Sequence, residues 1–351
     1  MKSNLYKIQL KEKDSISDVA TDLGIDVKVL IDFHNSNSQP HEWIRKDLTI
    51  APWVKELIIP DTAENLRKIK NLRESKDVVQ LVQTEVKARY KIVQKIDMQI
   101  SGSSMIDSET EIIWNHSKTK KENVFYSDIK QESHQIKYIK SIYRQFAEYM
   151  QKLNKPLEHL ILELFDEGKV KALSNQNEVK EIWSSLKKEL KPEMGNTPEE
   201  KNMIEGGDKD FSNTLPLINN NVLYKLFFND LFYQYSELDI FVDLEQQEYI
   251  SQIFAAEKVM LSKKRKVKKE GDLVRIKLYY ESDPKKNGRL KEIYNTKLKD
   301  FLQEDYSYSL TWSIEYLFEI RQGKMLSCHS KIKEQASSKY CHLTEHTIEL
   351  I

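Results

Sequence analysis

Two Cys-His pairs near the end of the chain are the residues whose types could bind a metal ion. Cys328-His329 and Cys341-His342 supply two thiols and two imidazoles, which are common zinc ligands. Their spacing argues against a shared site, because neighbouring residues on a strand point to opposite faces of a sheet. We therefore expect no metal site and no cofactor. Two alternatives stay open for the cysteines: unpaired thiols, or a disulfide if they lie opposite each other across a hairpin.

A run of basic residues at positions 262–269, SKKRKVKK, is the strongest local charge in the sequence. Such a run can bind phosphate or nucleic acid. It also lies beside a predicted turn at 270–272, where lysines commonly keep an exposed strand soluble and unpaired. No aromatic residues are interleaved with it to stack on bases, and the whole chain balances 55 basic residues against 55 acidic ones. We favour an exposed strand and expect no nucleic-acid partner.

Catalytic motifs are absent from the sequence. It has no glycine-rich phosphate loop, no G-x-S-x-G turn and no H-E-x-x-H helix. Glu163 and Asp166 are carboxylates of a predicted hairpin, and no acid that pairs with them is identifiable. We assign no catalytic residue. An enzyme, or a pocket for an apolar ligand lined by some of the 17 tyrosines, is the alternative for the C-terminal part.

Long alternating stretches dominate the sequence after residue 80 and predict antiparallel strands with one wet face. Residues 86–100 and 306–320 alternate apolar and polar side chains throughout. The spacing of apolar residues between them predicts helices at 133–153, after Asn177 and at 219–235. Further strands are expected at 106–114, 124–129, 157–165, 169–173, 249–260, 273–280, 325–332 and 340–348, and a further helix after Pro284. The fold class expected is α+β, with twisted antiparallel sheets, in the form of half-barrels as one possibility, covered by helices.

The chain length of 351 residues favours more than one domain. We expect a small unit at 1–60, a helical linker at 61–80 and an α+β domain at 81–192 in the order hairpin, helix, hairpin, helix. A mobile loop is expected at 193–213, because this stretch contains Pro198 and three glycines and directly follows Pro192. A second α+β domain is expected at 214–351, with a helix, a hairpin, a helix and an antiparallel meander.

The first sixty residues predict a strand, two short helices and a second strand. Tyr6, Ile8 and Leu10 alternate with polar residues, and Asp14 or Ser15 can cap the helix that follows. Gly24 stands where that helix should end. A second helix is expected at 28–33 with Asn35 in the loop after it, and a second strand at 48–50, ending at Pro52. Residues 54–60 form another strand or a connector.

This βααβ stretch resembles a LysM domain, a small module known for binding N-acetylglucosamine polymers such as peptidoglycan and chitin. The residues that carry the resemblance are Tyr6, Ile8, Asp14, Ser15, Ile16, Ser17, Val19, Ala20, Gly24, Val27, Leu30, Asn35, Leu48, Ile50 and Pro52. The sequence departs from the family pattern at Lys13 and at 45–47, where glycines are usual. The resemblance implies that a glycan or a partner is bound by the loops holding Asp14, Ser15, Ile16, Asn35 and Trp43.

The leading functional expectation is a non-enzymatic binding or adaptor protein, with the LysM-like unit as its docking module. LysM units without secretion signals occur in contractile injection systems and phage tails. The resemblance therefore implies a bacterial accessory protein whose partner is a baseplate, spike or effector protein. The alternative is a cell-wall protein that binds peptidoglycan. The opening residues lack an apolar segment, so we expect a cytoplasmic protein, with signal-independent export or a cell-envelope location as the alternative. No apolar run is long enough for a membrane span.

Overall fold

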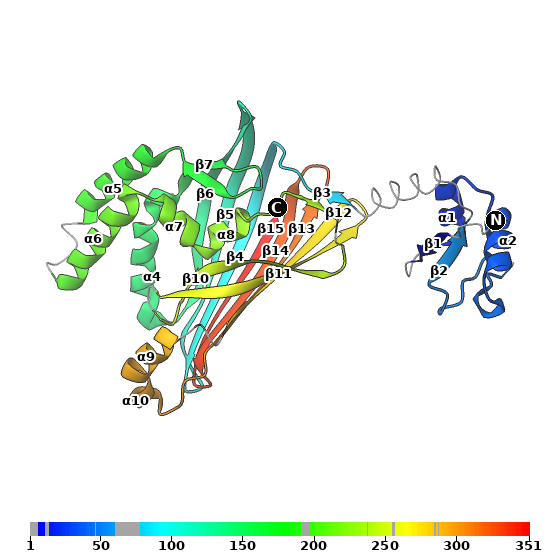
Figure 1. The fold of residues 1–351 in the computed structure, drawn as a ribbon. Helices are drawn as coiled ribbons and strands as arrows, with labels where there is room; N and C mark the ends of the chain where they lie inside the picture. The colour runs from blue at the N-terminus through cyan, green and yellow to red at the C-terminus, as the bar shows by residue number, and fades with distance from the viewer. Residues whose placement is uncertain are drawn as a thin grey trace. The chain divides into compact units, whose positions relative to one another are not determined.

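The computed structural model describes residues 6–10, 14–45, 47–59, 78–190, 197–236, 238–254, 257–283, 286 and 288–351, without the side chains of residues 199 and 200. It separates the chain into two compact units, residues 1–78 and 79–351 (Figure 1). Most of the predicted linker at 61–80, namely residues 61–77, lies outside the described residues. Residues 79 and 80 form a short strand, β3 (Val79–Gln80), which pairs with β9 (Gln234–Tyr235).

The N-terminal unit has the predicted order of strand, two helices and strand. Strand β1 (Tyr6–Gln9) is followed by α1 (Ile16–Leu23), α2 (Val27–Asn37), the short 3-10 helix η1 (Pro40–Glu42) and β2 (Glu56–Ile59). Ser15 caps α1 by accepting a hydrogen bond from the Asp18 amide, and Gly24 ends the helix at φ +62°. The core of this unit consists of Ile8, Ile16, Val19, Ala20, Leu23, Leu30, Ile31, Ile44, Leu57 and Ile59.

Two predictions for this unit are wrong. The strand expected at 48–50 does not form, because Leu48 has a positive φ of 66° and an exposed side chain. The partner of β1 is instead the stretch at 56–59, where Ile8 lies opposite Leu57. Asn35 lies inside α2 and not in a loop, because the helix continues to Asn37.

The larger unit is built on one sheet of eleven strands, all paired antiparallel. The strand order is β10-β11-β12-β13-β14-β15-β4-β5-β6-β7-β8. The bounds are β4 (Val86–Ile100), β5 (Ser103–Lys121), β6 (Val124–Ile139), β7 (His159–Leu164), β8 (Val170–Leu173), β10 (Phe241–Ile250), β11 (Lys258–Glu270), β12 (Leu273–Ser282), β13 (Ser309–Glu319), β14 (Lys324–Ser337) and β15 (Tyr340–Leu350). The last strand of the chain, β15, pairs with β4, so the segments expected as two α+β domains contribute to one sheet.

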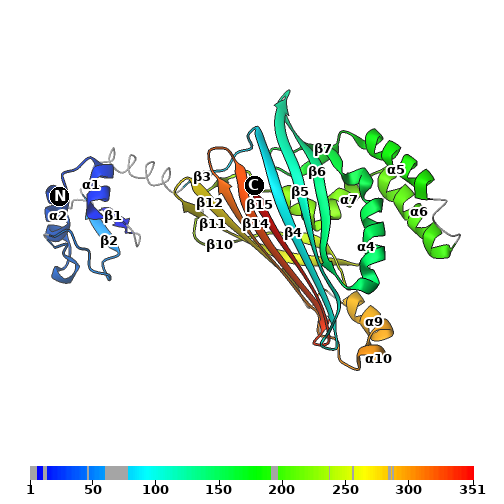
Figure 2. The same ribbon diagram turned by 180° about the vertical axis from the view of Figure 1, so that it is seen from behind.

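The helices of this unit are α4 (Ser141–Leu153), α5 (Gln176–Leu190), α6 (Pro198–Ser212), α7 (Leu215–Asn220), α8 (Val222–Phe227), α9 (Gly288–Lys297) and α10 (Lys299–Leu302), with the 3-10 helix η2 (Lys155–Leu157). Seen from behind, the strands lie in front of α7 (Figure 2). Aromatic contacts join α8 to the covered face: Trp114 stacks on Tyr224 and Tyr90 meets Phe227 edge to face. Amphipathic helices and an alternating sheet thus bury one common core.

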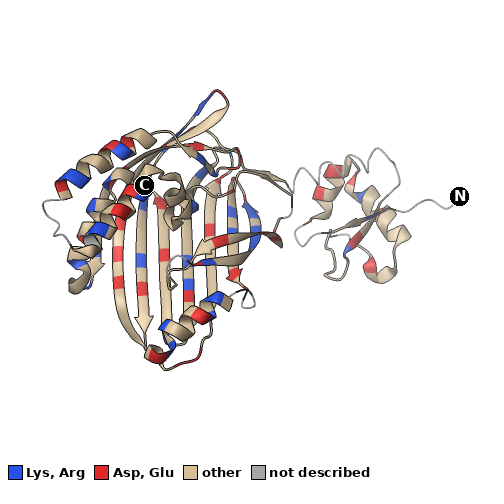
Figure 3. Cartoon of the chain, turned by 60° about the vertical axis from the view of Figure 1, so that its left-hand side comes forward, with Lys and Arg blue, Asp and Glu red and all other residues tan. Residues whose placement is uncertain are grey.

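The opposite face of the sheet is polar. Charged residues recur along its strands (Figure 3). Glu111 on β5 pairs with Lys91 at 2.9 Å and Lys137 at 3.1 Å, and Lys331 pairs with Glu345 at 2.7 Å across β14 and β15. This arrangement follows from the alternation read in the sequence, which places every second residue in water.

Several element predictions for this unit need correction. The stretch at 249–260 is not one strand: it spans the end of β10, a turn and the start of β11. The helix expected at 219–235 breaks at Asn221, whose side chain caps α8 by accepting from the Leu223 amide. Strand β6 runs to Ile139, so the helix expected from residue 133 begins at Ser141.

The mobile loop expected at 193–213 is mostly helix α6. Residues 191–196 lie outside the described part, but 198–212 are helical. The two glycines that suggested flexibility are inside this helix. A Cβ atom on Gly207 would lie 2.3 Å from Cζ2 of Trp183, so this glycine permits close packing of α6 on α5.

Candidate functional site

Around the start of α1, two of the three predicted ligand residues stabilise the fold itself. The Ser15 hydroxyl is used in capping α1, with Oγ 3.1 Å from the Asp18 nitrogen. Ile16 is fully buried in the core of the unit. Asp14 is partly exposed at the edge of the same turn. Of these three predicted residues, Ser15 is exposed, Asp14 is partly exposed and Ile16 is removed from solvent.

Asn35 is held by the backbone on the other side of the unit. Its Nδ2 donates to the Ile44 carbonyl at 3.0 Å, and its Oδ1 accepts from the Ile44 amide at 2.9 Å. Both ends of the amide group are thus used to fasten the segment after α2. Asn35 positions the loop that carries Trp43 and has little capacity left for a ligand.

His34 performs a similar task and was not singled out in the sequence. The ring is buried, its Nδ1 accepts from the Ile58 amide at 2.9 Å, and its Nε2 lies 3.1 Å from the Glu42 carbonyl. The imidazole therefore ties β2 and η1 to α2. The motif F-H-N gave no signal for this role, because the partners are backbone atoms distant in sequence.

Two exposed tryptophans follow η1 in the chain, and we call them together the indole surface (Trp43 and Trp53). Their exposed fractions are 49% and 64%. Trp43 follows directly after η1, and Trp53 Nε1 donates to the His41 carbonyl at 2.8 Å. Flat apolar rings with their faces in water can stack on a sugar ring or on side chains of a partner. Trp43 was predicted from the sequence; Trp53 was missed, although its position beside Pro52 in a loop was a usable signal.

The Cys-His pairs of the larger unit do not meet. Cys328 is buried and His329 is exposed, which is the opposite-face arrangement expected of a strand. Cys328 lies opposite Ile348 and Cys341 opposite Gln335, so the alternative of a disulfide across the hairpin is wrong, and both thiols are free. Across the described ranges, no three His, Cys, Asp or Glu side chains form a group that could hold a metal ion.

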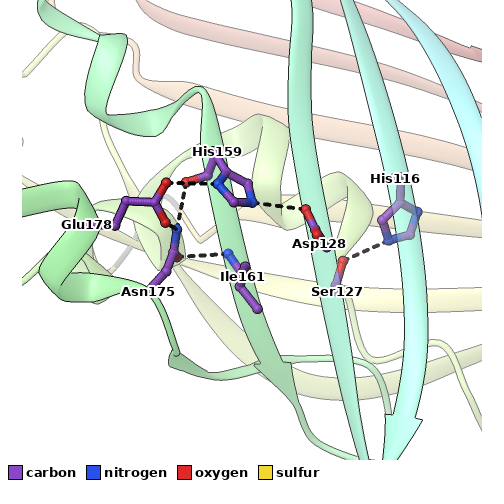
Figure 4. A network of polar contacts seen from close by, with 7 residues as sticks. All are labelled: His116, Ser127, Asp128, His159, Ile161, Asn175 and Glu178. Carbon is purple, nitrogen blue, oxygen red and sulfur yellow. Dashed lines mark hydrogen bonds and ion pairs between the residues drawn. The ribbon is translucent and has the colours of Figure 1, made fainter. Parts of the chain in front are cut away.

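A polar network on β6, β7 and α5 has residue types familiar from catalysis (Figure 4). His159 lies between two carboxylates, with Nδ1 3.0 Å from Glu178 and Nε2 3.2 Å from Asp128. Asn175 donates to Glu178 and accepts from the Ile161 amide. Hydrogen bonds from Asn175 and His159 lower the pKa of Glu178. Because both ring nitrogens of His159 are occupied, the network fastens α5 to the sheet and leaves the ring no atom for a substrate.

His116 and Ser127 form a second close pair, with Nε2 2.7 Å from Oγ. Ser127 is fully buried, so a substrate would have no access to its hydroxyl. Asp128, the adjacent acid, contacts His159 instead of His116. The pair therefore lacks both the access and the orienting acid that a nucleophilic serine needs.

Beside His116 lies a buried lysine in a small cavity of about 30 Å³. Lys118 is 5% exposed, and its ammonium group lies 4.5 Å from the centroid of Phe232. Burial lowers the pKa of Lys118 to about 8 and that of His116 to about 3. Within the described structure, Gln83 Oε1 and His116 Nδ1 have no hydrogen-bond partner. The cavity is large enough for about one or two water molecules, which could satisfy these atoms.

No helix among the described residues is both long and apolar enough to cross a membrane.

Comparisons with known proteins place the chain in no family. No family model matches the sequence, and no curated protein matches it. Among solved structures, one titled "Lipid-protein interactions in lipovitellin" is similar over 78% of this chain, with 9% identity and a TM-score of 0.41. The match spans a quarter (25%) of the lipovitellin chain. An outer membrane channel from Pseudomonas putida F1 is similar over 77% of this chain and 98% of its own, with 9% identity and a TM-score of 0.17. Because both TM-scores lie below 0.5, neither likeness assigns this chain a family or a function.

Proposed function

We propose that this chain is a non-enzymatic binding protein, an adaptor whose LysM-like N-terminal unit docks onto a partner through the indole surface. The observation that supports this proposal is the exposure of Trp43, which directly follows η1, and of Trp53, which bonds to His41 of η1. An aromatic side chain buries about 150–250 Å² when fully covered, so each of these half-exposed indoles leaves roughly half of that area for a partner. Tryptophan is also frequent among residues that dominate binding. The sheet unit, with its own core, is then the body that the docking unit connects to the partner.

The partner class comes from the LysM resemblance. A bacterial contractile injection system or phage-tail particle is the setting that the resemblance implies, with a baseplate, spike or effector protein as the docked partner. The experiment is photo-crosslinking in cells of the source organism, with a photoreactive residue at position 43 or 53. We expect a single covalent adduct whose mass spectrum identifies a particle component.

Position 29 is the matched control for this experiment. Val29 is also apolar and exposed, at 56%, but lies on α2. An adduct at 43 or 53 that is equally abundant at 29 would contradict docking through the indole surface. The absence of any adduct at all three positions, with the protein expressed and folded, would contradict the adaptor proposal itself.

Peptidoglycan binding is the second candidate, and the same indoles favour it, because tryptophan faces commonly stack on sugar rings. Its test is cosedimentation of the purified protein with insoluble peptidoglycan. We expect retention by the wild type and loss of retention by W43S/W53S, with V29S unchanged. Retention that survives W43S/W53S would exclude a glycan site on this surface, and retention lost with it would replace the adaptor proposal by the glycan one.

A further inference from the structure

A cavity lies in the sheet unit, at the two free edges of its sheet. Its volume is about 730 Å³, within the range of about 300–1,000 Å³ typical of small-molecule sites. Val170 of the edge strand β8 lines one side and Leu244 to Gln247 of the opposite edge strand β10 line another. Helices α7 and α8 and the segment after them complete the wall. Strand β10 is irregular here, with a register shift between Leu244 and Gln247.

Positive charge is in excess around this cavity. Lys169, Lys225, Lys263 and Arg265 line it, against the carboxylates of Asp230 and Glu245, so four cations face two anions. Lys263 is 6% exposed and contacts one oxygen of Asp230 at 2.8 Å, while Lys169 contacts the other at 3.4 Å. One carboxylate is thus shared by two ammonium groups. Each ammonium has three donors, so the pair retains unused donors and one uncompensated charge.

The other two cations have no carboxylate in ion-pair distance among the described residues. Arg265 lies over the ring of Tyr235, 4.7 Å from its centroid. Lys225 is partly buried on α8, and burial lowers its pKa, with Glu248 opposing that effect. A partly buried cation with no carboxylate in ion-pair distance is stabilised when an anion joins it.

The basic run on β11 supplies two of the four cations that line the cavity. Because side chains alternate along a strand, the run divides into two sets. Lys263 and Arg265 line the cavity, whereas Lys264 pairs with Asp243 and Lys268 with Glu270. The sequence alone suggested that this run keeps an exposed edge strand soluble. One of its two faces instead lines the cavity. Moreover, β11 is covered by β10 and is not an edge strand.

We propose that this cavity binds a small organic ligand carrying an oxyanion group, a phosphate or a carboxylate, which Arg265 and Lys225 hold together with the Lys263–Asp230–Lys169 cluster. Guanidinium and ammonium donors recognise both groups through charge-assisted hydrogen bonds. The remaining wall suits an organic moiety, since Phe165, Tyr224 and Phe228 supply aromatic surface and Asn219 and Gln247 supply polar groups. The proposal is independent of the indole surface and does not rest on the adaptor function.

The test is calorimetric titration of the full chain with phenyl phosphate and with benzoate, which separate the two sources of the oxyanion. Phenol and benzamide are the neutral counterparts. We expect at least one of the two anions to bind with a Kd of about 0.1–1 mM and its neutral counterpart to bind at least about tenfold more weakly. Inorganic phosphate should compete with the bound anion.

Variants of the same strand provide the matched comparison. R265Q/K225Q should weaken binding of the anion about tenfold or more, because each substitution removes a charge-assisted donor. K264Q/K266Q removes two charges from the same run and should change the Kd less than about twofold. Near-UV circular dichroism verifies folding, and R265Q alone is the fallback if the double variant unfolds.

Three results would overturn the proposal. The first is that neither anion binds at concentrations up to about 10 mM, and the second is that the neutral counterparts bind equally well. The third is that R265Q/K225Q and K264Q/K266Q weaken binding equally. The first would leave the cavity as a solvent-filled gap between sheet edges. The last would mean that the ligand binds the general charge of β11 and not the cavity.

Discussion

The two units of this protein place their tryptophan side chains in opposite ways. In the N-terminal unit, Trp43 and Trp53 are in water, and the buried polar residue His34 has a backbone partner on each ring nitrogen. In the sheet unit, aromatic side chains such as Trp312 fill the core, and several buried polar atoms lack partners, including those beside Lys118. Among the described residues, the N-terminal unit has one such atom, Ser38 Oγ, and the sheet unit has six, in keeping with the larger core that can tolerate them. The comparison therefore directs the search for function to the surface of the N-terminal unit and to the interior of the sheet unit.

The largest expected effect is the loss of a core aromatic from the sheet. Trp312 is 1% exposed, stacks on Tyr280 with centroids 4.8 Å apart, and donates from Nε1 to Ser330 Oγ at 2.8 Å. W312A should lower the free energy of unfolding of the sheet unit by about 3–5 kcal/mol. Hydrogen exchange resolved by peptide should show faster exchange in residues 79–351 and unchanged exchange in the N-terminal unit.

Phe241 is the matched control, since it is an exposed aromatic residue on β10 of the same sheet. F241A should change the free energy of unfolding by less than about 0.5 kcal/mol. Faster exchange throughout both units in W312A would contradict the division into two independently stable units.

The next effect concerns the buried cation in the sheet unit. Burial lowers the pKa of Lys118 to about 8, below the value of about 10.4 expected in the unfolded chain. Below pH 8, both states are protonated and folding bears the cost of burying the charge. Between about pH 8 and 10.4, the unfolded state binds more protons, so wild-type stability should rise with pH. K118M removes the buried charge and should raise the free energy of unfolding at pH 7 by about 2–3 kcal/mol.

Urea unfolding at pH 7 and pH 10.5 checks this prediction, because the gain from K118M should nearly vanish at the higher pH. Lys120 provides the control: it lies near Phe125 as Lys118 does but is exposed. K120M should be close to neutral at both pH values. A K118M variant that is less stable at pH 7 would show that the contact with Phe232 outweighs the burial of charge.

A smaller effect on stability is expected for Asn35, a predicted ligand residue whose side chain bonds the backbone of Ile44. N35A removes both hydrogen bonds to Ile44 and should lower the free energy of unfolding of this unit by about 1–2 kcal/mol. Asn37 also bonds a backbone carbonyl, that of Phe33, but is exposed, so N37A should cost under about 0.5 kcal/mol. If N35A is as stable as the wild type but no longer docks, Asn35 contacts the ligand and does not mainly stabilise the fold.

The sequence predicted those elements whose signals are local. The alternation at 86–100 and 306–320 predicted β4 and β13, and the Ser15 cap and Gly24 stop predicted the limits of α1. It failed where distant segments decide the outcome. The pairing of β15 with β4, which merges two expected domains into one sheet, depends on residues far apart in the chain, such as Ile348 and Ile92. The same limit applies to sites. Trp43 could be named from its type, but the meeting of Lys169, Asp230 and Lys263 required the folded chain.

The smallest effect on stability should come from the indole surface, and this separates binding from folding. Trp43 and Trp53 are about half exposed or more, and the one hydrogen bond of Trp53, to the His41 carbonyl, is open to water. W43S/W53S should therefore change the free energy of unfolding by less than about 0.5 kcal/mol while weakening docking at least about tenfold. Thermal unfolding and quantitative crosslinking of the same samples measure both quantities. If the variant instead unfolds, the indoles stabilise the small unit itself, and the docking proposal loses the observation that supports it.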